Sequence, residues 1–512
     1  TGTWTSPPGT CWRVPPRAVA AIEVWQAATE ARPLALSGGL ADVLRALPAA
    51  LARMGHPVRR FLPAYGSVDR AGFIPDPPGL KVPLGPDGIS VKFLSRTETD
   101  GFVTTLVECD ELFGRPEIYG PPGGEYPDNA RRFTLFARAV AERAKIARRP
   151  PDILHVHDWH LGLVPLFVRF DPFWKRRPGT LLTVHNMGHQ GHFPATELRW
   201  LSLKGDLRER LFTPGGIEYY GGINFLKAGL LYADRINAVS PSYAREILTP
   251  EFGCGLEGVL SLRRGDLGGI LNGADYDLWD PAADPHLPEK YGPDSLEGKE
   301  KSRQRLRKEF GLRPGVRPLL GVVSRLVHQK GIDLLCEAVP GILKAGADLV
   351  ILGDGEPALV RKLRRLQRSQ PRRMGLRIQF NDGYAHLVMA GSDFVLVPSR
   401  YEPCGLTQMY ALRYGTIPIV ARTGGLLDTV RDETEMPGRG TGFMMRGGTA
   451  GDLLEAVRRG LAFRGADRGL WRKMQRRAMA EDFSWDRAAR EYADLYGEIL
   501  RAAGRGTGPV RS

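Results

Sequence analysis

The residues best suited to chemistry lie in two short segments in the second half of the chain. One of them follows an apolar run, 394–397, and reads Pro-Ser-Arg-Tyr-Glu-Pro-Cys-Gly-Leu before Thr407. The run predicts a buried parallel strand, and the Pro and Gly residues after it predict a turn that opens a helix near Thr407. Ligands bind at the carboxyl ends of parallel strands, and the free amides that open a helix favour an anion. We therefore expect the carboxylate of Glu402, inside this turn, to face a bound molecule.

The second segment, 324–330, follows another apolar run and contains Arg325 and Lys330. Two cations in a loop at the carboxyl end of a strand are typical of a phosphate clamp. In a basic protein the same two residues also occur as ordinary surface charges. From the pattern alone, both interpretations stay open.

Two polar clusters follow predicted strands in the first half of the chain, at 155–160 (His-Val-His-Asp-Trp-His) and at 185–190 (His-Asn-Met-Gly-His-Gln). Metal binding is the first alternative to exclude. We expect His155, His157 and His160 to alternate between the faces of a strand, and no HExxH or carboxylate pattern accompanies them. The interpretation that we favour is hydrogen bonding to a substrate at the strand ends.

The pair Gly38-Gly39 stands where a phosphate-binding turn would stand, between a first strand and a first helix. Without a Cβ atom, two glycines let backbone amides approach an anion closely. Such a pair is also a frequent plain turn. Pro48 lies inside the predicted helix, where proline costs about 3 kcal/mol unless a kink is accommodated.

The elements that must position these residues alternate between strand and helix, which predicts an α/β protein with mostly parallel sheets. The pattern restarts after a Pro- and Asp-rich segment, 274–293, so we expect two domains. The expected divisions are a disordered leader at 1–20, domains at 21–272 and 273–484, and a final helix and tail at 485–512. The expected strands are 21–28, 59–63, 103–107, 153–156, 181–184 and 236–239, then 319–324, 349–352, 377–380, 394–397 and 417–421.

Composition excludes several classes of protein. The chain has 512 residues, 42% of them hydrophobic, which is enough for two cores. Its formal charge is +14, but the densest basic run, 361–368, has leucines at helical spacing and reads as a solvated helix face, with no nucleic-acid motif. The five cysteines are scattered and lack CxxC spacing, which predicts a reducing compartment and no zinc site. No apolar run reaches the roughly 18 residues of a membrane helix.

Taken together, the motifs resemble those of the bacterial glycogen synthases and plant starch synthases of glycosyltransferase family 5. The resemblance runs from about residue 30 to about residue 500. It rests on the segments 38–42 (Gly-Gly-Leu-Ala-Asp), 126–133, 157–160 (His-Asp-Trp-His), 184–186, 224–229, 239–247, 324–331 (Ser-Arg-Leu-Val-His-Gln-Lys-Gly), 402–406 (Glu-Pro-Cys-Gly-Leu) and 413–416.

This resemblance implies the GT-B fold, in which two Rossmann-like, doubly wound domains face a central cleft and the last helix crosses back to the first domain. It places the acceptor glucan on the first domain and the nucleotide sugar on the second. It implies a glucosyltransferase that moves glucose from ADP-glucose to the non-reducing end of an α-1,4-glucan with retention at the anomeric carbon. ADP-glucose is then a substrate, and no cofactor or metal is implied. The expected partners include neither nucleic acid nor a membrane; oligomeric state stays open, and the expected compartment is a bacterial cytoplasm, with a plastid as the alternative.

By position in the family, Arg325 and Lys330 would hold the diphosphate and stabilise the leaving group. Each unit-charge pair at 4 Å gains about 4 kcal/mol at an effective dielectric of 20. Glu402 would grip the glucose hydroxyls as a positioning and electrostatic group, and His185 would contact the transferred glucose. The remaining expected substrate-binding residues are Gly38, Gly39, Asp158, Asn186, Asn224, Cys404, Gly405, Leu406 and Thr407; for Asp158 and Asn224 a purely structural hydrogen bond stays open.

The sequence also departs from the family pattern. Leu36 stands where the family has a lysine near the donor, and loss of one charged hydrogen bond, roughly 1.5–3 kcal/mol, predicts impairment more than abolition. The other departures are Phe380, Leu387 and the pair Ser302-Arg303. Two alternatives therefore accompany the synthase: a weakened paralogue that binds glucan or regulates, and a related transferase that uses another nucleotide sugar.

Overall fold

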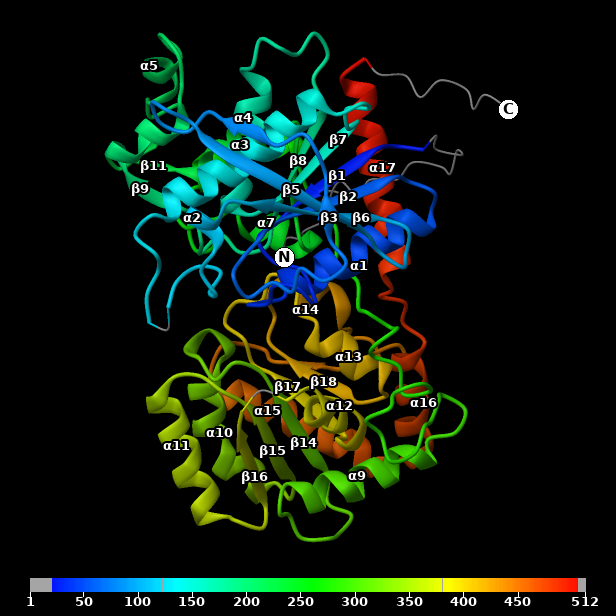
Figure 1. Cartoon of the computed structure of the whole chain (residues 1–512). Helices are drawn as coiled ribbons and strands as arrows, with labels where there is room; N and C mark the ends of the chain where they lie inside the picture. Colours follow the sequence, from blue (N-terminus) through cyan, green and yellow to red (C-terminus); the bar gives the residue numbers. More distant parts are fainter. Residues whose placement is uncertain (1–20, 122, 380, 505–512) are drawn as a thin grey trace. The chain divides into compact units, whose positions relative to one another are not determined.

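The computed structural model describes residues 21–121, 123–379 and 381–504 (Figure 1). The described residues form two compact units: the part up to Asn272 together with the part from Trp485 onward, and Gly273–Ser484. The expected leader at 1–20, residues 505–512 of the expected tail, and Phe380 lie outside the described residues.

The first unit is built on a mixed sheet with the strand order β13-β12-β8-β7-β1-β2-β6-β5-β3, and β4 pairs with β5. The strands from β13 to β6 pair in parallel, while β5 runs antiparallel to β6. Their bounds are β1 Val24–Ala27, β2 Val58–Pro63, β3 Ile74–Pro75, β4 Leu80–Val82, β5 Ile89–Thr97, β6 Val103–Glu108, β7 Ile153–His157, β8 Gly179–Val184, β12 Arg235–Ala238 and β13 Leu267–Gly269.

A separate small antiparallel sheet orders β10-β11-β9. Its strands are β9 His192–Pro194, β10 Glu218–Tyr219 and β11 Gly222–Asn224. The helices of the first unit are α1 Leu40–Arg53, α2 Asp110–Phe113, α3 Asn129–Ile146, η1 Trp159–Leu161, α4 Leu163–Arg169, η2 Ala195–Leu201, α5 Leu207–Leu211, α6 Phe225–Tyr232, α7 Pro241–Glu246, α8 Glu257–Leu262, η3 Arg264–Asp266 and α17 Trp485–Ala502.

The second unit has one sheet, whose strands run β16-β15-β14-β17-β18-β19 and pair in parallel throughout. The strands are β14 Leu319–Val323, β15 Asp348–Gly353, β16 Met374–Ile378, β17 Phe394–Val397, β18 Ile417–Val420 and β19 Phe443–Met444. The helices are α9 Glu297–Glu309, η4 His328–Lys330, α10 Ile332–Lys344, α11 Pro357–Ser369, α12 Asp382–Gly391, α13 Thr407–Arg413, α14 Gly424–Thr429, α15 Ala450–Ala466 and α16 Arg468–Met479.

In this sheet the strand order is that of a doubly wound dinucleotide-binding fold, with β14 first and β17 fourth along the chain. The expectation of a strand at 377–380 was wrong by three residues, because β16 starts where Met374 pairs with Leu349 of β15.

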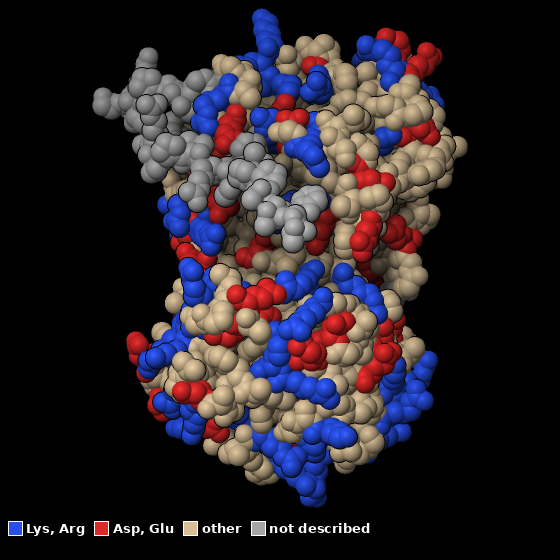
Figure 2. Space-filling model, turned by 180° about the vertical axis from the view of Figure 1, so that it is seen from behind, with Lys and Arg blue, Asp and Glu red and all other residues tan. Residues whose placement is uncertain are grey.

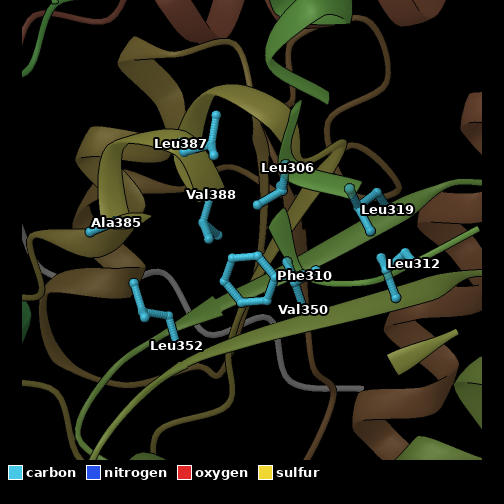
Figure 3. Close-up of a cluster of buried hydrophobic side chains, with 9 residues drawn as sticks. All are labelled: Leu306, Phe310, Leu312, Leu319, Val350, Leu352, Ala385, Leu387 and Val388. Carbon is cyan, nitrogen blue, oxygen red and sulfur yellow. The ribbon is translucent and has the colours of Figure 1, made fainter. Parts of the chain in front are cut away.

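One face of the second sheet is sealed by an apolar cluster that joins α9 and α12 to β14 and β15 (Figure 3). Phe310, which caps the C-terminus of α9, lies among side chains from all of these elements. The cluster consists of Leu306, Phe310, Leu312, Leu319, Val350, Leu352, Ala385, Leu387 and Val388. Through Leu319 it anchors β14, the strand before the segment that carries Arg325 and Lys330.

Helix α1 contains the buried Pro48 and continues past it to Arg53. Proline has no N–H, so the carbonyl of Leu44, four residues earlier, loses its helical donor. The guanidinium of Arg60, on β2, replaces that donor with a bond from Nη1 to the Leu44 carbonyl oxygen of 2.6 Å. Burial lowers the pKa of Arg60 to about 10. A side chain from the sheet thus completes the helix that follows the Gly38-Gly39 turn.

Helix α17 returns to the first unit, as the family resemblance implied, and packs against α1 and β8. Its apolar stripe is buried and consists of Trp485, Ala489, Tyr492, Tyr496 and Ile499. Two of these side chains also carry hydroxyls into the core: Tyr492 accepts a 3.0 Å hydrogen bond from Asn237, and Tyr496 lies 2.8 Å from Nδ1 of His155.

Candidate active site

The two charged segments of the second unit meet at the switch point of its sheet. Strands β14 and β17 are neighbours. From β14 the chain continues to β15 on one side of the pair, and from β17 it continues to β18 on the other side. The loop after β14 carries Arg325 and Lys330, and the turn after β17 carries Glu402. The topology therefore brings together residues 72 positions apart in the sequence.

Lys330, Glu402 and Ser399 form a compact group that we call the charged cluster. The Nζ atom of Lys330 lies 2.7 and 2.6 Å from Oε1 and Oε2 of Glu402. The hydroxyl of Ser399 donates to Oε2 at 2.8 Å. Glu402 is only 7% exposed. Since an ammonium has three N–H donors, Lys330 keeps one for another anion while it holds the carboxylate.

A close backbone approach and several side-chain bonds hold the two loops together. Gly331 has a φ of +66°, and a Cβ atom there would lie 2.0 Å from the carbonyl oxygen of Pro398, so only glycine lets the loops approach this closely. Arg400 then bridges them, with one guanidinium nitrogen 2.7 Å from each carboxylate oxygen of Asp333. Fully buried Gln408 donates to the carbonyls of Cys404 and Gly405 and fixes the far side of the turn.

The other predicted residues of this region occupy different environments. Arg325 is exposed, and its Nη2 atom lies 3.4 Å from Oε1 of Gln329. Cys404 is buried, and Gly405 has a φ of +72°. Leu406 is the N-cap of α13 and Thr407 its first residue, and no described side chain caps that helix end. Sequence reasoning missed Ser399 and Gln408, although both lie within six residues of Glu402.

In the first unit, the equivalent switch point lies between β1 and β7. Asp158 follows β7 directly, with a φ of 57° that non-glycine residues adopt only under strain. Its Oδ1 accepts a 2.7 Å hydrogen bond from the backbone N–H of His185, which follows β8. Burial, with a smaller contribution from the charge of Glu30, raises the pKa of Asp158 to about 7. The structure thus brings the predicted residues Asp158 and His185 into contact.

Three imidazoles form a row beside this aspartate, which we call the histidine cluster: His155, His157 and His185. The rings of His155 and His157 have centroids 4.2 Å apart, and Nδ1 of His157 lies 3.0 Å from Nε2 of His185. The ring nitrogens of His155 contact Tyr496 and Thr183 at 2.8 and 2.7 Å. Burial lowers the pKa of His155 and of His185 to about 3, and that of His157 well below its ordinary value. All three rings are therefore neutral at physiological pH.

The expectation that His155, His157 and His160 alternate between faces was wrong. His155 and His157 are two residues apart on β7, so the period of the strand puts them on one face. His160 lies beyond the strand, in η1, and stacks on Trp159 and Tyr119 with centroid distances of 3.9 and 4.9 Å. Among the described residues, no group of three or more His, Cys, Asp or Glu side chains is arranged to hold a metal ion.

The Gly38-Gly39 turn already contains an anion from the chain itself. Oε2 of Glu30 accepts the backbone N–H groups of Ser37 and Gly38 at 2.9 and 2.7 Å. The hydroxyl of Tyr119 donates to the other oxygen of Glu30 at 2.5 Å. Gly39 is the N-cap of α1. Sequence reasoning missed Glu30, which lies eight residues before Gly38.

Asn186 and Asn224 both make local bonds. The side-chain oxygen of Asn186 accepts the N–H of Gly188 at 2.9 Å. Asn224 is fully buried and caps α6, accepting from the N–H of Lys227 at 2.8 Å, while its amide donates to Gln190 at 2.7 Å. Of the two interpretations left open for Asn224, its contacts match the structural hydrogen bond.

The departures from the family pattern fall in different environments. Leu36 is 51% exposed. Leu387 packs in the apolar cluster of Figure 3 and Ser302 donates to the Gly298 carbonyl at 3.0 Å. Buried Arg303 pairs with Asp393 at 2.7 Å. Leu387, Ser302 and Arg303 thus serve the packing of the second unit.

The basic run expected to be a solvated helix face is α11, which buries Leu359, Val360 and Leu363 and exposes arginines on the other side. Over the face of the molecule in Figure 2, Lys and Arg side chains are interspersed with Asp and Glu. No helix among the described residues is both long and apolar enough to cross a bilayer.

Comparison with known proteins agrees with this geometry. Residues 23–262 match the family model of the starch synthase catalytic domain, and residues 303–475 match that of glycosyl transferases group 1. The catalytic domain of starch synthase IV from Arabidopsis thaliana, bound to ADP and acarbose, superposes with a TM-score of 0.85 at 31% identity, covering 94% of this chain and all of that one. A sucrose-phosphate synthase from Thermosynechococcus elongatus shares the fold, with a TM-score of 0.58 at 21% identity over 94% of this chain and 99% of that one. The fold and its switch-point residues define a GT-B glycosyltransferase.

Among GT-B glycosyltransferases, the curated relatives of this chain are glycogen synthases. Glycogen synthase 2 of Geobacter metallireducens is 43% identical over 484 residues, covering 93% of this chain and 98% of the relative. The glycogen synthase of Koribacter versatilis is 42% identical over 474 residues, covering 92% and 96%. The chain belongs to the glycogen and starch synthase family and is a glucosyltransferase of glucan synthesis.

Proposed function

We propose that this protein transfers glucose from ADP-glucose to the non-reducing end of an α-1,4-glucan, with retention at the anomeric carbon. The observation that carries the proposal is the charged cluster at the switch point of the second unit, where Lys330 already holds Glu402. A switch point is where doubly wound sheets bind nucleotides, so the donor belongs there. The proposal needs no metal or cofactor.

Lys330 and Arg325 act on the diphosphate. As the bond from the anomeric carbon to the phosphate oxygen breaks, negative charge grows on the leaving group, and a cation already in place stabilises it without reorganisation. Lys330 is oriented by Glu402, whereas exposed Arg325 is free to close on a phosphate in bidentate geometry. The amides of Cys404 to Thr407 line the same turn and contribute donors to the phosphate and the sugar.

Glu402 holds the glucose hydroxyls as an acceptor and balances positive charge at the anomeric carbon. Its two oxygens are occupied by Lys330 and Ser399, so it is a positioning group and not a nucleophile. The new bond forms between the anomeric carbon and the acceptor hydroxyl on the face that the diphosphate leaves. The proton of that hydroxyl passes to the departing phosphate, so atoms and charge balance without an enzyme-bound intermediate.

In the first unit, His185 donates to or accepts from the transferred glucose, and Asp158 holds the backbone that presents it. Asn186 is a further sugar contact, and the Gly38-Gly39 turn contacts the donor. Asn224 acts indirectly, since its buried side chain holds the start of α6.

The test is transfer of label from ADP-[14C]glucose to precipitated glycogen, with UDP-[14C]glucose in parallel. We expect incorporation from ADP-glucose, and almost none with Glu402→Gln. A glucan without label at saturating donor would contradict the proposal. Greater incorporation from UDP-glucose would instead keep the reaction and change the donor.

Exposed Leu36, at the position of the family lysine, favours one second candidate: a glucan-binding protein with weak turnover. It predicts retention on a glycogen-containing gel without transfer. Since the charged cluster is complete, we place this candidate second. The relatives are bacterial proteins, which supports a bacterial cytoplasm as the place of action.

A further inference from the structure

The end of β7 holds His185 at two points. Asp158 accepts the backbone N–H of His185 at 2.7 Å. The residue before it, His157, lies with its Nδ1 atom 3.0 Å from Nε2 of the His185 ring. The backbone and the ring of one candidate site residue are thus held by two consecutive residues, the last residue of β7 and the one that follows it.

Both imidazoles are neutral, so only one of the two facing nitrogens carries a proton and donates it to the other. In the first arrangement His157 donates from Nδ1, and its Nε2 is a bare acceptor. In the second, His185 donates from Nε2, and His157 must carry its proton on its own Nε2. The two arrangements give His185 opposite tautomers.

The surroundings of His157 distinguish the two arrangements. Its Nε2 atom is buried and has no hydrogen-bond partner among the described residues. The second arrangement would put an N–H at that position with no described acceptor, and orphaned buried N–H groups are rarer in proteins than under-used acceptors. The first arrangement leaves only a lone pair there. It therefore fits the surroundings of His157 better.

We propose that His157 is a positioning residue that donates to His185 and holds it in the tautomer with its proton on Nδ1. That nitrogen has no partner among the described residues, and His185 is partly exposed. His185 then offers a neutral N–H donor to its ligand. On the proposed function, this donor meets a hydroxyl oxygen of the transferred glucose and adds no full charge beside the anomeric carbon.

The direct test is NMR of protein labelled with 15N-histidine, in which protonated and bare ring nitrogens have separate shifts. We expect His185 protonated on Nδ1 and His157 also on Nδ1, in the free protein. A His185 ring protonated on Nε2 would overturn the proposal. This measurement requires no turnover, so its result is independent of whether ADP-glucose is the donor.

Variants supply the second test. His157→Leu removes the contact, and we expect a mixed His185 tautomer and a loss of kcat/KM of about tenfold, the size of one hydrogen bond. His157→Asn keeps an amide donor near the same place and should restore most of the loss. Unchanged tautomer and unchanged kcat/KM in His157→Leu would contradict the proposal.

The matched control is Tyr496→Phe, which removes a buried hydroxyl from the next ring of the row, His155. It should lower Tm and leave both the tautomer of His185 and kcat/KM as they are. If Tyr496→Phe shifts the tautomer as much as His157→Leu does, the effect comes from packing, and the proposal fails. Should His157→Leu not fold, the wild-type NMR spectrum still decides.

Discussion

The charged cluster and the histidine cluster occupy the same topological position in two sheets, yet they are electrostatic opposites. In each unit the first and fourth strands of the doubly wound order lie side by side, β14 with β17 and β1 with β7. The charged cluster lies in the loops after β14 and β17, whereas the histidine cluster lies on β7 and directly after β8. In the charged cluster, the ammonium of Lys330 forms an ion pair with the carboxylate of Glu402. In the histidine cluster, all three imidazoles are neutral. The backbone topology sets where a site forms, and the side chains alone set its charge.

On the proposed function, each cluster suits a different chemical group of the donor. A diphosphate develops negative charge as it leaves, which suits preorganised cations. A sugar ring offers hydroxyls, which suit neutral donors and acceptors. Since burial lowers the pKa of His185 to about 3, that residue keeps its neutral role throughout the working range of pH. The following four predictions test how strictly the two clusters divide this work.

The largest effect is expected on the charged side. Lys330→Met removes the cation, keeps most of the length of the side chain and leaves the Glu402 carboxylate without its ammonium partner. We expect kcat to fall about 10²–10³-fold, the size seen when one preorganised donor to a developing anion is removed. The measurement is label transfer at saturating donor. Lys362→Met, which removes a more exposed lysine 3.9 Å from Glu337, is the control and should retain full activity; a tenfold loss or less in Lys330→Met would mean that Lys330 is not the main cation.

The second prediction concerns the neutral side and its pH dependence. Asp158 has its pKa raised to about 7, above its unfolded value near 4, so its contribution to stability is present below pH 4 and is lost as the pH rises through 7. The loss amounts to at most about 4 kcal/mol, reduced by solvent screening. Asp158→Asn lacks this titration. The Tm of the variant minus the Tm of the wild type should therefore increase as the pH rises from 5 to 9. Parallel Tm curves in calorimetry would show that Asp158 is not held in its protonated form.

The third prediction adds a charge to the neutral side. Leu36 is 51% exposed, so Leu36→Lys places an ammonium beside the Gly38-Gly39 turn without disturbing the core. One charged hydrogen bond is worth about 1.5–3 kcal/mol, so we expect kcat/KM for the donor to rise at least about tenfold. Initial rates across donor concentrations measure it. No gain would mean that this turn does not contact the donor, and a Leu36→Met control should leave the rate as it was.

The smallest effect is expected from Glu30→Gln. The amide oxygen can still accept from Ser37 and Gly38, but without charge, and the difference is about 1 kcal/mol or a few-fold in donor KM. Because Glu30 helps to raise the pKa of Asp158, the Tm profile defined above should also shift to lower pH. A change in donor KM without a shift of the Tm profile would show that Glu30 acts on the Gly38-Gly39 turn but does not influence the pKa of Asp158.

Much of this arrangement was predictable from the sequence, because apolar runs and turn residues are local signals. The strand at 394–397 is present with those bounds, and the βα alternation gave both sheets. Contacts between distant residues were harder to predict. Nothing near Pro48 indicates that Arg60 completes its helix, and nothing near Tyr496 indicates a bond to His155, 341 residues away.

The candidate site shows the same division. Glu402, Lys330 and His185 were singled out by their loops and by the family resemblance. Ser399, the partner of Glu402, and Glu30, the partner of Gly38, were not, because a serine and a glutamate have no local pattern that marks them. His157 was noted within its polar cluster, but not as the partner of His185. Asn224 and Leu387 show the reverse: a family position drew attention to side chains that serve a helix cap and a core.

Because α17 belongs to the first unit, it affects the order in which the two units can finish folding during synthesis. The second unit is one continuous stretch, Gly273–Ser484, while the first unit needs residues 485–502 to cover the backs of β8 and α1 and to bring Tyr496 to His155. On the ribosome, domains usually fold as they emerge, N-terminal first. Here the unit that emerges first must wait for the last helix. Among the described elements, the histidine cluster therefore reaches its final hydrogen bonding after the charged cluster, whose residues all precede α17.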